Sequence, residues 1–162
     1  MKNNRNTSSD RVRKMVIAGM LSAIVAVLTF TLPGGQPLIY TGQEVGYDHS
    51  FAFFDKDHIP GYEENGYTAF YRKLITLKHN EKALQAGERG GRIIEIENNA
   101  KDCIMTIVRE CGESRVVAIL NLSPYTIHAD FNTGIYSGEY TDAMSGKQTT
   151  LPLHVEQDIE PW

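Results

Sequence analysis

The sequence has little of several things that would place it in a special class of protein. Its 162 residues include two cysteines, Cys103 and Cys111, too few for a disulfide scaffold, and we expect both to be reduced. The net charge is −4, without a long basic or acidic tract, which argues against a nucleic-acid partner bound through its phosphates. The five histidines show neither His-x-His nor His-x-x-x-His spacing, so no metal site and no cofactor are predicted.

The beginning of the chain differs from the rest in charge and hydropathy. Residues 1–14 carry five basic side chains against one acid, and residues 15–32 are almost entirely apolar. A basic segment before such a run predicts a membrane-inserted helix or a signal sequence; a helix buried inside a large soluble protein is the alternative. Whether the protein is cytoplasmic, exported or membrane-associated depends on this choice, and the sequence leaves it open.

The next part predicts a strand, a long loop and a helix. Residues 37–41, Pro-Leu-Ile-Tyr-Thr, are typical of a short strand buried in a parallel sheet. Residues 43–65 are rich in glycine, aspartate and aromatics and predict a long loop. Residues 66–84 then have helical periodicity, with Asn65 as the N-cap and Gly87 closing the end. The apolar stripe of this helix consists of Tyr67, Phe70, Tyr71, Leu74 and Leu77.

After residue 87 the helical pattern gives way to short runs rich in isoleucine, valine and threonine. Turn clusters with glycine, asparagine, serine or proline separate them, which is typical of an antiparallel sandwich. The predicted strands are Arg92–Glu97, Cys103–Arg109, Arg115–Leu122, Thr126–Phe131 and Thr149–Val155. A turn at Gly112 would join the second and third of them, with Cys103 opposite residues near Asn121.

Several motifs, in chain order, resemble the alpha-amylase family, glycoside hydrolase family 13. Residues 35–44, Gly-Gln-Pro-Leu-Ile-Tyr-Thr-Gly-Gln-Glu, are similar to the family's Gly-x-Pro-x-x-Tyr-x-Gly-x-Glu signature at the eighth strand of the catalytic barrel. Residues 53–57 resemble the loop after that strand, residues 70–84 the eighth helix, and residues 118–123 a strand of the C-terminal β-sandwich. Order and spacing match over residues 26–162, so the resemblance covers most of the chain.

The resemblance implies a composite α+β fold: the last β/α unit of a (β/α)8 TIM barrel followed by an all-β antiparallel sandwich. Residues 1–30 would be a basic arm and an apolar helix, which is either membrane-like or a remnant of a barrel helix. Residues 31–86 would be the end of the barrel, with strand eight, its loop and helix eight. Residues 87–162 would be the C-terminal sandwich domain, truncated at its end.

The resemblance also implies a function in carbohydrate metabolism. The parent enzyme would be a retaining glycosidase that acts on alpha-glucans or maltooligosaccharides through two carboxyl groups. The family carries its acids on barrel strands four, five and seven, the last in an Asn-His-Asp motif, and this sequence has no Asn-His-Asp. We therefore expect an inactive C-terminal fragment whose intramolecular partner is the missing barrel half. The alternatives are a non-catalytic carbohydrate-binding module and a chain anchored to a membrane through residues 15–32.

Six residues are candidates for contacts with the oligosaccharide in the complete enzyme. They are Tyr40, Gln43, Glu44, Asp55, Lys56 and Asp57. The implied barrel topology directs the loop that carries them toward the active-site face. Several also have a purely structural explanation: Glu44 would orient its neighbours, and two acids on a loop, such as Asp55 and Asp57, are usually solvated charges. No catalytic residue and no metal ligand is assigned.

Residues 1–30 resemble the start of a membrane transporter subunit more than the polar connection expected before strand eight of the barrel. One hypothesis is therefore a fused or misassembled reading frame, with the join within residues 26–31. The family usually continues beyond Trp162 with another strand, so we also expect the end of the domain to be cut.

Overall fold

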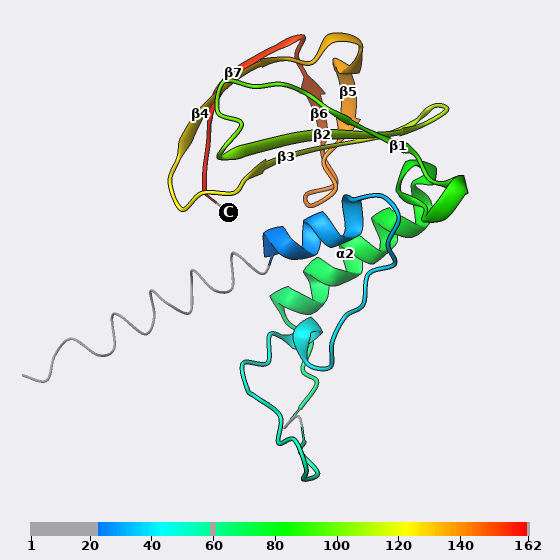
Figure 1. Cartoon of the computed structure of the whole chain (residues 1–162), viewed down its shortest axis with the longest axis vertical. Coiled ribbons are helices and arrows are strands. Elements are labelled where there is room, and N and C mark those ends of the chain that lie inside the picture. The colour runs from blue at the N-terminus through cyan, green and yellow to red at the C-terminus, as the bar shows by residue number, and fades with distance from the viewer. Residues whose placement is uncertain (1–22, 59–60, 162) are drawn as a thin grey trace, which may run out of the picture.

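The structure, a computed structural model, describes residues 23–58 and 61–161. The β domain lies at one end of the molecule, the helical part lies next to it, and a long loop extends from the helical part away from the β domain (Figure 1). The basic arm and the first part of the apolar run, on which the membrane and fusion hypotheses depend, lie in residues 1–22, outside the described residues.

Two helices pack against each other in the helical part. Residues 23–31 form the first, and α2 (Gly66–Asn80) forms the second. Their shared cluster of buried side chains consists of Ala26, Phe30, Tyr71 and Leu74. The apolar face of residues 23–31 is thus covered by protein. Among the described residues, no helix combines the length and the apolar character that a membrane crossing needs.

The predicted start of α2 is confirmed. The Asn65 side chain accepts hydrogen bonds from the Tyr67 amide (2.9 Å) and the Thr68 amide (3.3 Å). The Thr68 hydroxyl in turn accepts from the Asn65 amide (3.3 Å), which completes a capping box. These contacts satisfy backbone donors that the first helical turn leaves without partners.

The predicted end of the helix is too late. α2 ends at Asn80, because Glu81 is extended (φ −89°, ψ 112°) and the chain continues into a 3₁₀ turn, η2 (Lys82–Leu84). Ala83 and Leu84 are fully buried there, so packing against the β domain replaces a further helical turn. Gly87 opens the next 3₁₀ turn, η3 (Gly87–Arg89), with a left-handed φ of 68°, and does not close α2.

The predicted strand at residues 37–41 is wrong for this structure: the segment is extended, but no strand of the described residues pairs with it. A strand exists only with a hydrogen-bonded neighbour, and here none is present. Its side chains nevertheless alternate as in a strand with one covered face. Pro37 and Ile39 are half-buried, while Leu38 and Tyr40 are 83% and 65% exposed.

The second half of the chain is an antiparallel β domain, as expected. β1 (Arg92–Glu95), β2 (Ile104–Cys111) and β3 (Ser114–Asn121) form one sheet, β4 (Ile127–Asn132) pairs with β7 (His154–Ile159), and β5 (Gly138–Thr141) pairs with β6 (Gln148–Leu151). Inward side chains of the first two sheets and of a connecting turn share one core. Its buried members are Ile96, Ile104, Val108, Ala129, Phe131, Tyr136 and Val155.

Four of the five predicted strands are confirmed to within two residues at each end. The fifth, residues 149–155, is wrong: it is two strands, β6 and β7, which belong to different sheets. Pro152 lies between them and has no amide hydrogen for a continuous ladder. β5 was not predicted, because this short strand is polar and mostly exposed and shows no apolar alternation.

The predicted β2–β3 hairpin is confirmed. Gly112 takes a left-handed φ of 63° at its tip, and Cys111 pairs with Ser114 beside it. At the other end the Leu122 amide donates to the Cys103 carbonyl (2.7 Å), next to the pair Ile104–Asn121. Both cysteines are free thiols, in agreement with the sequence.

Arg109 of β2 joins the β domain to the helical part. Its side chain is buried, with the residue only 1% exposed. Nη1 donates to the Thr31 carbonyl (2.5 Å) at the end of the first helix, and Nη2 and Nε donate to the Gly91 carbonyl (2.8 and 3.3 Å). Burial lowers the pKa of Arg109, but a guanidinium starts so high that it stays charged at neutral pH.

Two lysines of α2 make further bonds between elements. Lys78 Nζ donates to the carbonyls of Leu84 (2.9 Å) and Phe30 (3.3 Å). It thus provides a hydrogen-bond donor for a carbonyl at the end of η2 and for one at the end of the first helix. Burial lowers the pKa of Lys78, and the nearby charge of Arg109 lowers it further. Lys73 Nζ donates to the Met144 carbonyl in the β5–β6 connection. Lys73 thus joins α2 directly to the β domain, whereas Lys78 joins α2 to the first helix and to η2.

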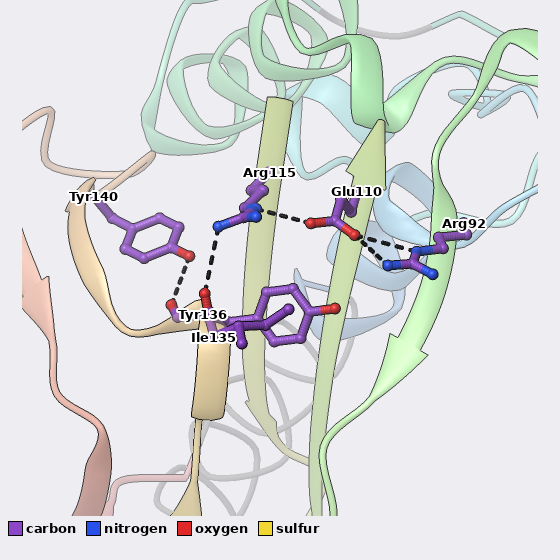
Figure 2. A network of polar contacts seen from close by, with 6 residues as sticks. All are labelled: Arg92, Glu110, Arg115, Ile135, Tyr136 and Tyr140. Atoms are coloured by element: carbon purple, nitrogen blue, oxygen red, sulfur yellow. Dashed lines mark hydrogen bonds and ion pairs between the residues drawn. The ribbon is translucent and has the colours of Figure 1, made fainter. Parts of the chain in front are cut away.

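A charged network joins the three-stranded sheet to the turn η4 (Gly134–Tyr136). Figure 2 shows Glu110 between two arginines; its carboxylate accepts from Arg92 Nη2 (2.6 Å) and Arg115 Nε (2.9 Å). Arg115 also donates to the Ile135 carbonyl (3.4 Å) and lies 5.6 Å from the centre of the Tyr136 ring. The arginines lower the pKa of Glu110, with the Arg92 hydrogen bond as the largest cause.

We expect Arg109→Met to lower the free energy of unfolding by about 3 kcal/mol, because two buried carbonyls lose a charged donor. Arg72→Met is the matched control, since the Arg72 side chain is 62% exposed and its ion pair with Glu64 should contribute at most about 1 kcal/mol. Urea unfolding of both variants measures the difference. Equal losses would contradict the assigned role of Arg109.

The Glu110 network predicts a pH dependence. The folded-state pKa of Glu110 lies below its ordinary value of 4.5. The ionised carboxylate therefore stabilises the folded chain fully at pH values above 4.5, and this stabilisation is lost as the pH falls through the lowered folded-state pKa. Urea midpoints of the wild-type chain and Glu110→Gln should therefore converge as pH is lowered. Glu113→Gln, in the exposed hairpin turn, is the control and should show no such convergence.

Candidate functional site

Three of the candidate residues, Tyr40, Gln43 and Glu44, lie where the segment 37–41 meets the start of α2. A 3₁₀ turn, η1 (Gln43–Val45), follows the segment and is flanked by two glycines with left-handed backbones, Gly42 (φ 89°) and Gly46 (φ 67°). A Cβ atom at Gly46 would also lie 2.5 Å from the Tyr67 ring. The left-handed backbone therefore favours glycine at this position, and a larger residue would also have to displace the Tyr67 ring.

Tyr40 and Gln43 connect the extended segment to α2. The Gln43 side chain accepts from the Tyr40 amide (3.1 Å) and donates to the Tyr71 hydroxyl (2.6 Å). Burial raises the pKa of Tyr71, so its hydroxyl is neutral at physiological pH. The Tyr40 ring itself points outward and meets Phe51 edge-on, with 6.2 Å between the ring centres. Gln43 therefore has a positioning role, whereas most of the Tyr40 ring is accessible.

Glu44 is held through its backbone and not through its carboxylate. Its carbonyl accepts from the Thr68 hydroxyl (2.9 Å), which fixes η1 to the first turn of α2. The Oε2 atom is buried and has no hydrogen-bond partner among the described residues. The expected orienting hydrogen bonds from this oxygen are therefore absent from the described part of the chain, and the structure gives Glu44 no catalytic geometry.

Asp57 closes the loop that carries the other candidates. Its carboxylate accepts from the Ala52 amide (3.0 Å), the His58 amide (2.8 Å) and His49 Nε2 (3.1 Å). The Ala52 bond is the main cause of a lowered pKa at Asp57, followed by the His58 bond. Asp55 is exposed, as is Lys56. The structure thus separates the roles of the two acids: Asp57 is engaged within its loop, and Asp55 faces solvent.

The aromatic residues of the loop divide into two groups. Tyr47, His49 and Phe51 pack on one another, with ring centres 5.5 to 6.3 Å apart. Phe53 and Phe54 are 91% and 93% exposed, and their rings meet edge-to-face with 4.8 Å between the ring centres. The two rings are therefore not coplanar and do not form a flat surface on which a sugar ring could stack. The contact of His49 with Asp57 was not predicted, because no spacing signal in the sequence marks the pair.

The β domain offers no comparable aromatic surface. Of its described aromatic residues only Tyr125 is well exposed, at 72%; Phe131 and Tyr136 are buried, and the Tyr140 hydroxyl donates to the Tyr136 carbonyl (2.7 Å). A pair of coplanar exposed rings, which a sugar-binding module would use, is thus absent from residues 88–161.

Histidines and acids gather on the outer face of β4 and β7. His128 Nδ1 lies 2.9 Å from Asp158, which raises the pKa of His128, and His154 Nε2 lies 3.6 Å from Asp130. These are exposed pairs across β4 and β7, in which each histidine lies beside an acidic side chain of the neighbouring strand. Within the described residues, no group of three or more such side chains is arranged to hold a metal ion.

The fold defines the class of the second half: an antiparallel β domain that follows a helical segment in the same chain. Residues 95–157 match the family model "Alpha amylase, C-terminal all-beta domain". This match supports, for residues 95–157, the resemblance to the C-terminal domain of the alpha-amylase family seen in the sequence.

Two individual proteins are similar over most of this chain. Alpha-amylase MalA of Haloarcula japonica is 28% identical over 151 residues, which cover 89% of this chain and 22% of that protein. The crystal structure of a noncanonic maltogenic alpha-amylase, AmyB, from Thermotoga neapolitana matches with a TM-score of 0.72 at 15% identity, over 87% of this chain and 34% of that one. The chain thus spans only a fifth to a third of the length of these relatives.

We expect Asp57→Asn to expose the loop to chymotrypsin, because the variant loses the charged acceptor of two backbone amides and His49. Cleavage after Phe53 or Phe54 should become several-fold faster than in the wild-type chain. Asp55→Asn is the matched control, since Asp55 is exposed two residues away, and it should leave the rate unchanged. Equal rates for the two variants would show that Asp57 does not hold the loop.

Proposed function

We propose that this chain is the C-terminal part of an alpha-amylase-type glycoside hydrolase that acts on alpha-glucans or maltooligosaccharides. The supporting observation is that an alpha amylase C-terminal all-beta domain follows a helix, an extended segment and a second helix in one packed structure. The likeness to the maltogenic alpha-amylase covers 87% of the chain. That share is too large for the β domain alone, so it includes the helical part.

The arrangement of the two helices supports a barrel unit. Ile39 of the extended segment packs against the cluster formed by the first helix and α2, so both helices lie on the same side of the segment. In a (β/α)8 barrel every helix lies outside the strands, and the opposite face of each strand points to the barrel interior. Leu38 and Tyr40, on that opposite face, are exposed here and would be covered by the missing strands.

The candidate residues then acquire places in the complete enzyme. The loop after a barrel strand lies at the active-site face, which would bring Tyr40, Asp55 and Lys56 to the rim where sugar hydroxyls bind. Gln43 and Asp57 would position this rim, since their polar groups are occupied by Tyr71 and by the loop itself. Glu44, with one buried oxygen lacking a partner in the described residues, would face the missing barrel half.

The chain carries no Asn-His-Asp motif, and the acids of the family's mechanism belong to strands that precede this segment. We therefore propose that it is inactive alone and that the preceding barrel half is its intramolecular partner. A carbohydrate-binding module and a membrane-anchored chain gain no specific support from the described residues, because Tyr125 is a single ring and residues 23–31 pack on α2.

Sequencing the source DNA on one unbroken molecule tests the proposal. We expect an upstream reading frame that codes for barrel strands, contains an Asn-His-Asp segment and joins this sequence near Ala26. The proposal would be contradicted if translation starts at Met1 and the DNA upstream does not code for barrel strands. The full chain should also release no reducing sugar from maltooligosaccharides. A rate above background that Asp55→Asn or Asp57→Asn abolishes would show that the chain has chemistry of its own.

A further inference from the structure

The sequence contains a single Asn-Gly pair, Asn65-Gly66, at the point where the long loop enters α2 (Figure 1). Asparagine is a chemically labile residue. The backbone nitrogen of the next residue can attack its side-chain amide carbon, and a glycine has no Cβ to hinder that approach. Both residues are exposed, so water and base reach them. The pair is therefore a candidate site of covalent modification by deamidation.

The reaction needs water as its only co-reactant. The Gly66 nitrogen gives its proton to a base and bonds to Cγ of Asn65. The bond from Cγ to the side-chain nitrogen then breaks, and this nitrogen takes up a proton and leaves as ammonia. One water opens the resulting five-membered succinimide ring. Attack at Cγ gives aspartate, whereas attack at the main-chain carbonyl gives isoaspartate, in which the main chain runs through the former side chain and gains a methylene.

The cap of α2 holds this reaction back. Oδ1 of Asn65 accepts from the amides of Tyr67 (2.9 Å) and Thr68 (3.3 Å), and Nδ2 donates to the Val45 carbonyl (2.9 Å). Ring closure brings Cβ and Cα of Asn65 into one plane with the peptide bond to Gly66. This requires a rotation away from the extended ψ of −168° and takes Oδ1 away from both amides. The reaction therefore proceeds in chains whose cap has opened.

The two products differ in their effect on the contact between α2 and η1. Aspartate keeps an oxygen for the amides of Tyr67 and Thr68 and is itself a good N-cap residue, although it loses the donor to Val45. Isoaspartate moves the carboxylate and lengthens the main chain, so it loses both the cap and the bond to Val45. The remaining bond, from the Thr68 hydroxyl to the Glu44 carbonyl (2.9 Å), depends on the same first turn of α2.

We propose that Asn65-Gly66 is a site of deamidation that the α2 cap protects, and that its conversion to isoaspartate releases η1 and the loop before α2 from the helix. The change is one-way, because ammonia leaves. Since η1 carries Gln43 and Glu44, its release changes where both residues lie. The inference concerns this chain alone and does not depend on the proposed function.

The first test compares the folded and the unfolded chain. The full chain is incubated in mildly alkaline buffer with and without guanidinium chloride, and mass spectrometry follows its tryptic peptide 57–72. We expect Asn65 to convert about five- to tenfold more slowly in the folded chain, the factor by which a cap of ordinary strength suppresses its own opening. Asn98, which precedes Asn99, is the internal reference and should convert more slowly than Asn65 in the unfolded chain.

Two variants change the reaction and the cap separately, and circular dichroism checks the fold of each. Gly66→Ala should slow conversion at least about tenfold in the unfolded chain. A Cβ at this helical position meets nothing within 4 Å, so the fold is kept. Thr68→Val removes the acceptor of the Asn65 amide and should speed conversion several-fold in the folded chain only. Thr126→Val, whose hydroxyl bonds Glu160 in the β domain, is the matched control and should not change the rate.

Hydrogen exchange at the Tyr67 and Thr68 amides tests the consequence. We expect both amides to exchange at least about tenfold faster in the isoaspartate form, purified by chromatography, whereas Asn65→Asp should stay close to the wild-type chain. The inference is overturned if Asn65 converts no faster than Asn98 in the unfolded chain, or if folded and unfolded chains convert equally fast. It is also overturned if Thr68→Val and Thr126→Val act alike, or if the isoaspartate form protects both amides as the wild-type chain does.

Discussion

The contact on which the rest of the structure depends is the buried guanidinium of Arg109. It reaches from β2 to the last turn of the first helix and to the start of β1, and its partners there are backbone carbonyls. Because a buried charge without hydrogen bonds would be very costly, the helix end and the Gly91 turn must stay where the arginine needs them. Gly91 must also be glycine, since a Cβ there would lie 2.6 Å from the Glu110 carbonyl. This bond therefore fixes the helical part against the β domain.

The segment 37–41 is covered by protein on one side only. One face is packed on two helices, and the other face and both edges have no partner among the described residues. The most exposed large apolar side chains of the described residues, Leu38, Phe53 and Phe54, all lie in this segment or in the loop that follows it. The β domain, by contrast, encloses a complete core. Exposed apolar side chains are therefore concentrated in residues 37–54, and the β domain keeps most of its apolar side chains in its core.

Local patterns were sufficient for much of the fold. The Asn65 cap, the β2–β3 hairpin at Gly112 and four strand positions could be predicted because each depends on neighbours in the sequence. The division of residues 149–155 between two sheets, and the end of α2 at Asn80, could not, because partners distant in sequence decide them. The loop was predicted as a loop, but its closure by Asp57 and His49 depends on a turn whose geometry no spacing rule describes.

The sequence by itself determined the resemblance to the alpha-amylase family, through motifs whose residue types and order can be read without coordinates. It also determined that no Asn-His-Asp motif is present. Only the tertiary structure decided which polar groups are already in use. It assigned Gln43 to Tyr71 and Asp57 to its own loop, left Asp55 in solvent, and buried Arg109 among carbonyls. It also placed both helices on one side of residues 37–41. The physical reason is that a motif records which chemical groups are present, whereas their availability depends on hydrogen bonds and burial between segments far apart in the chain.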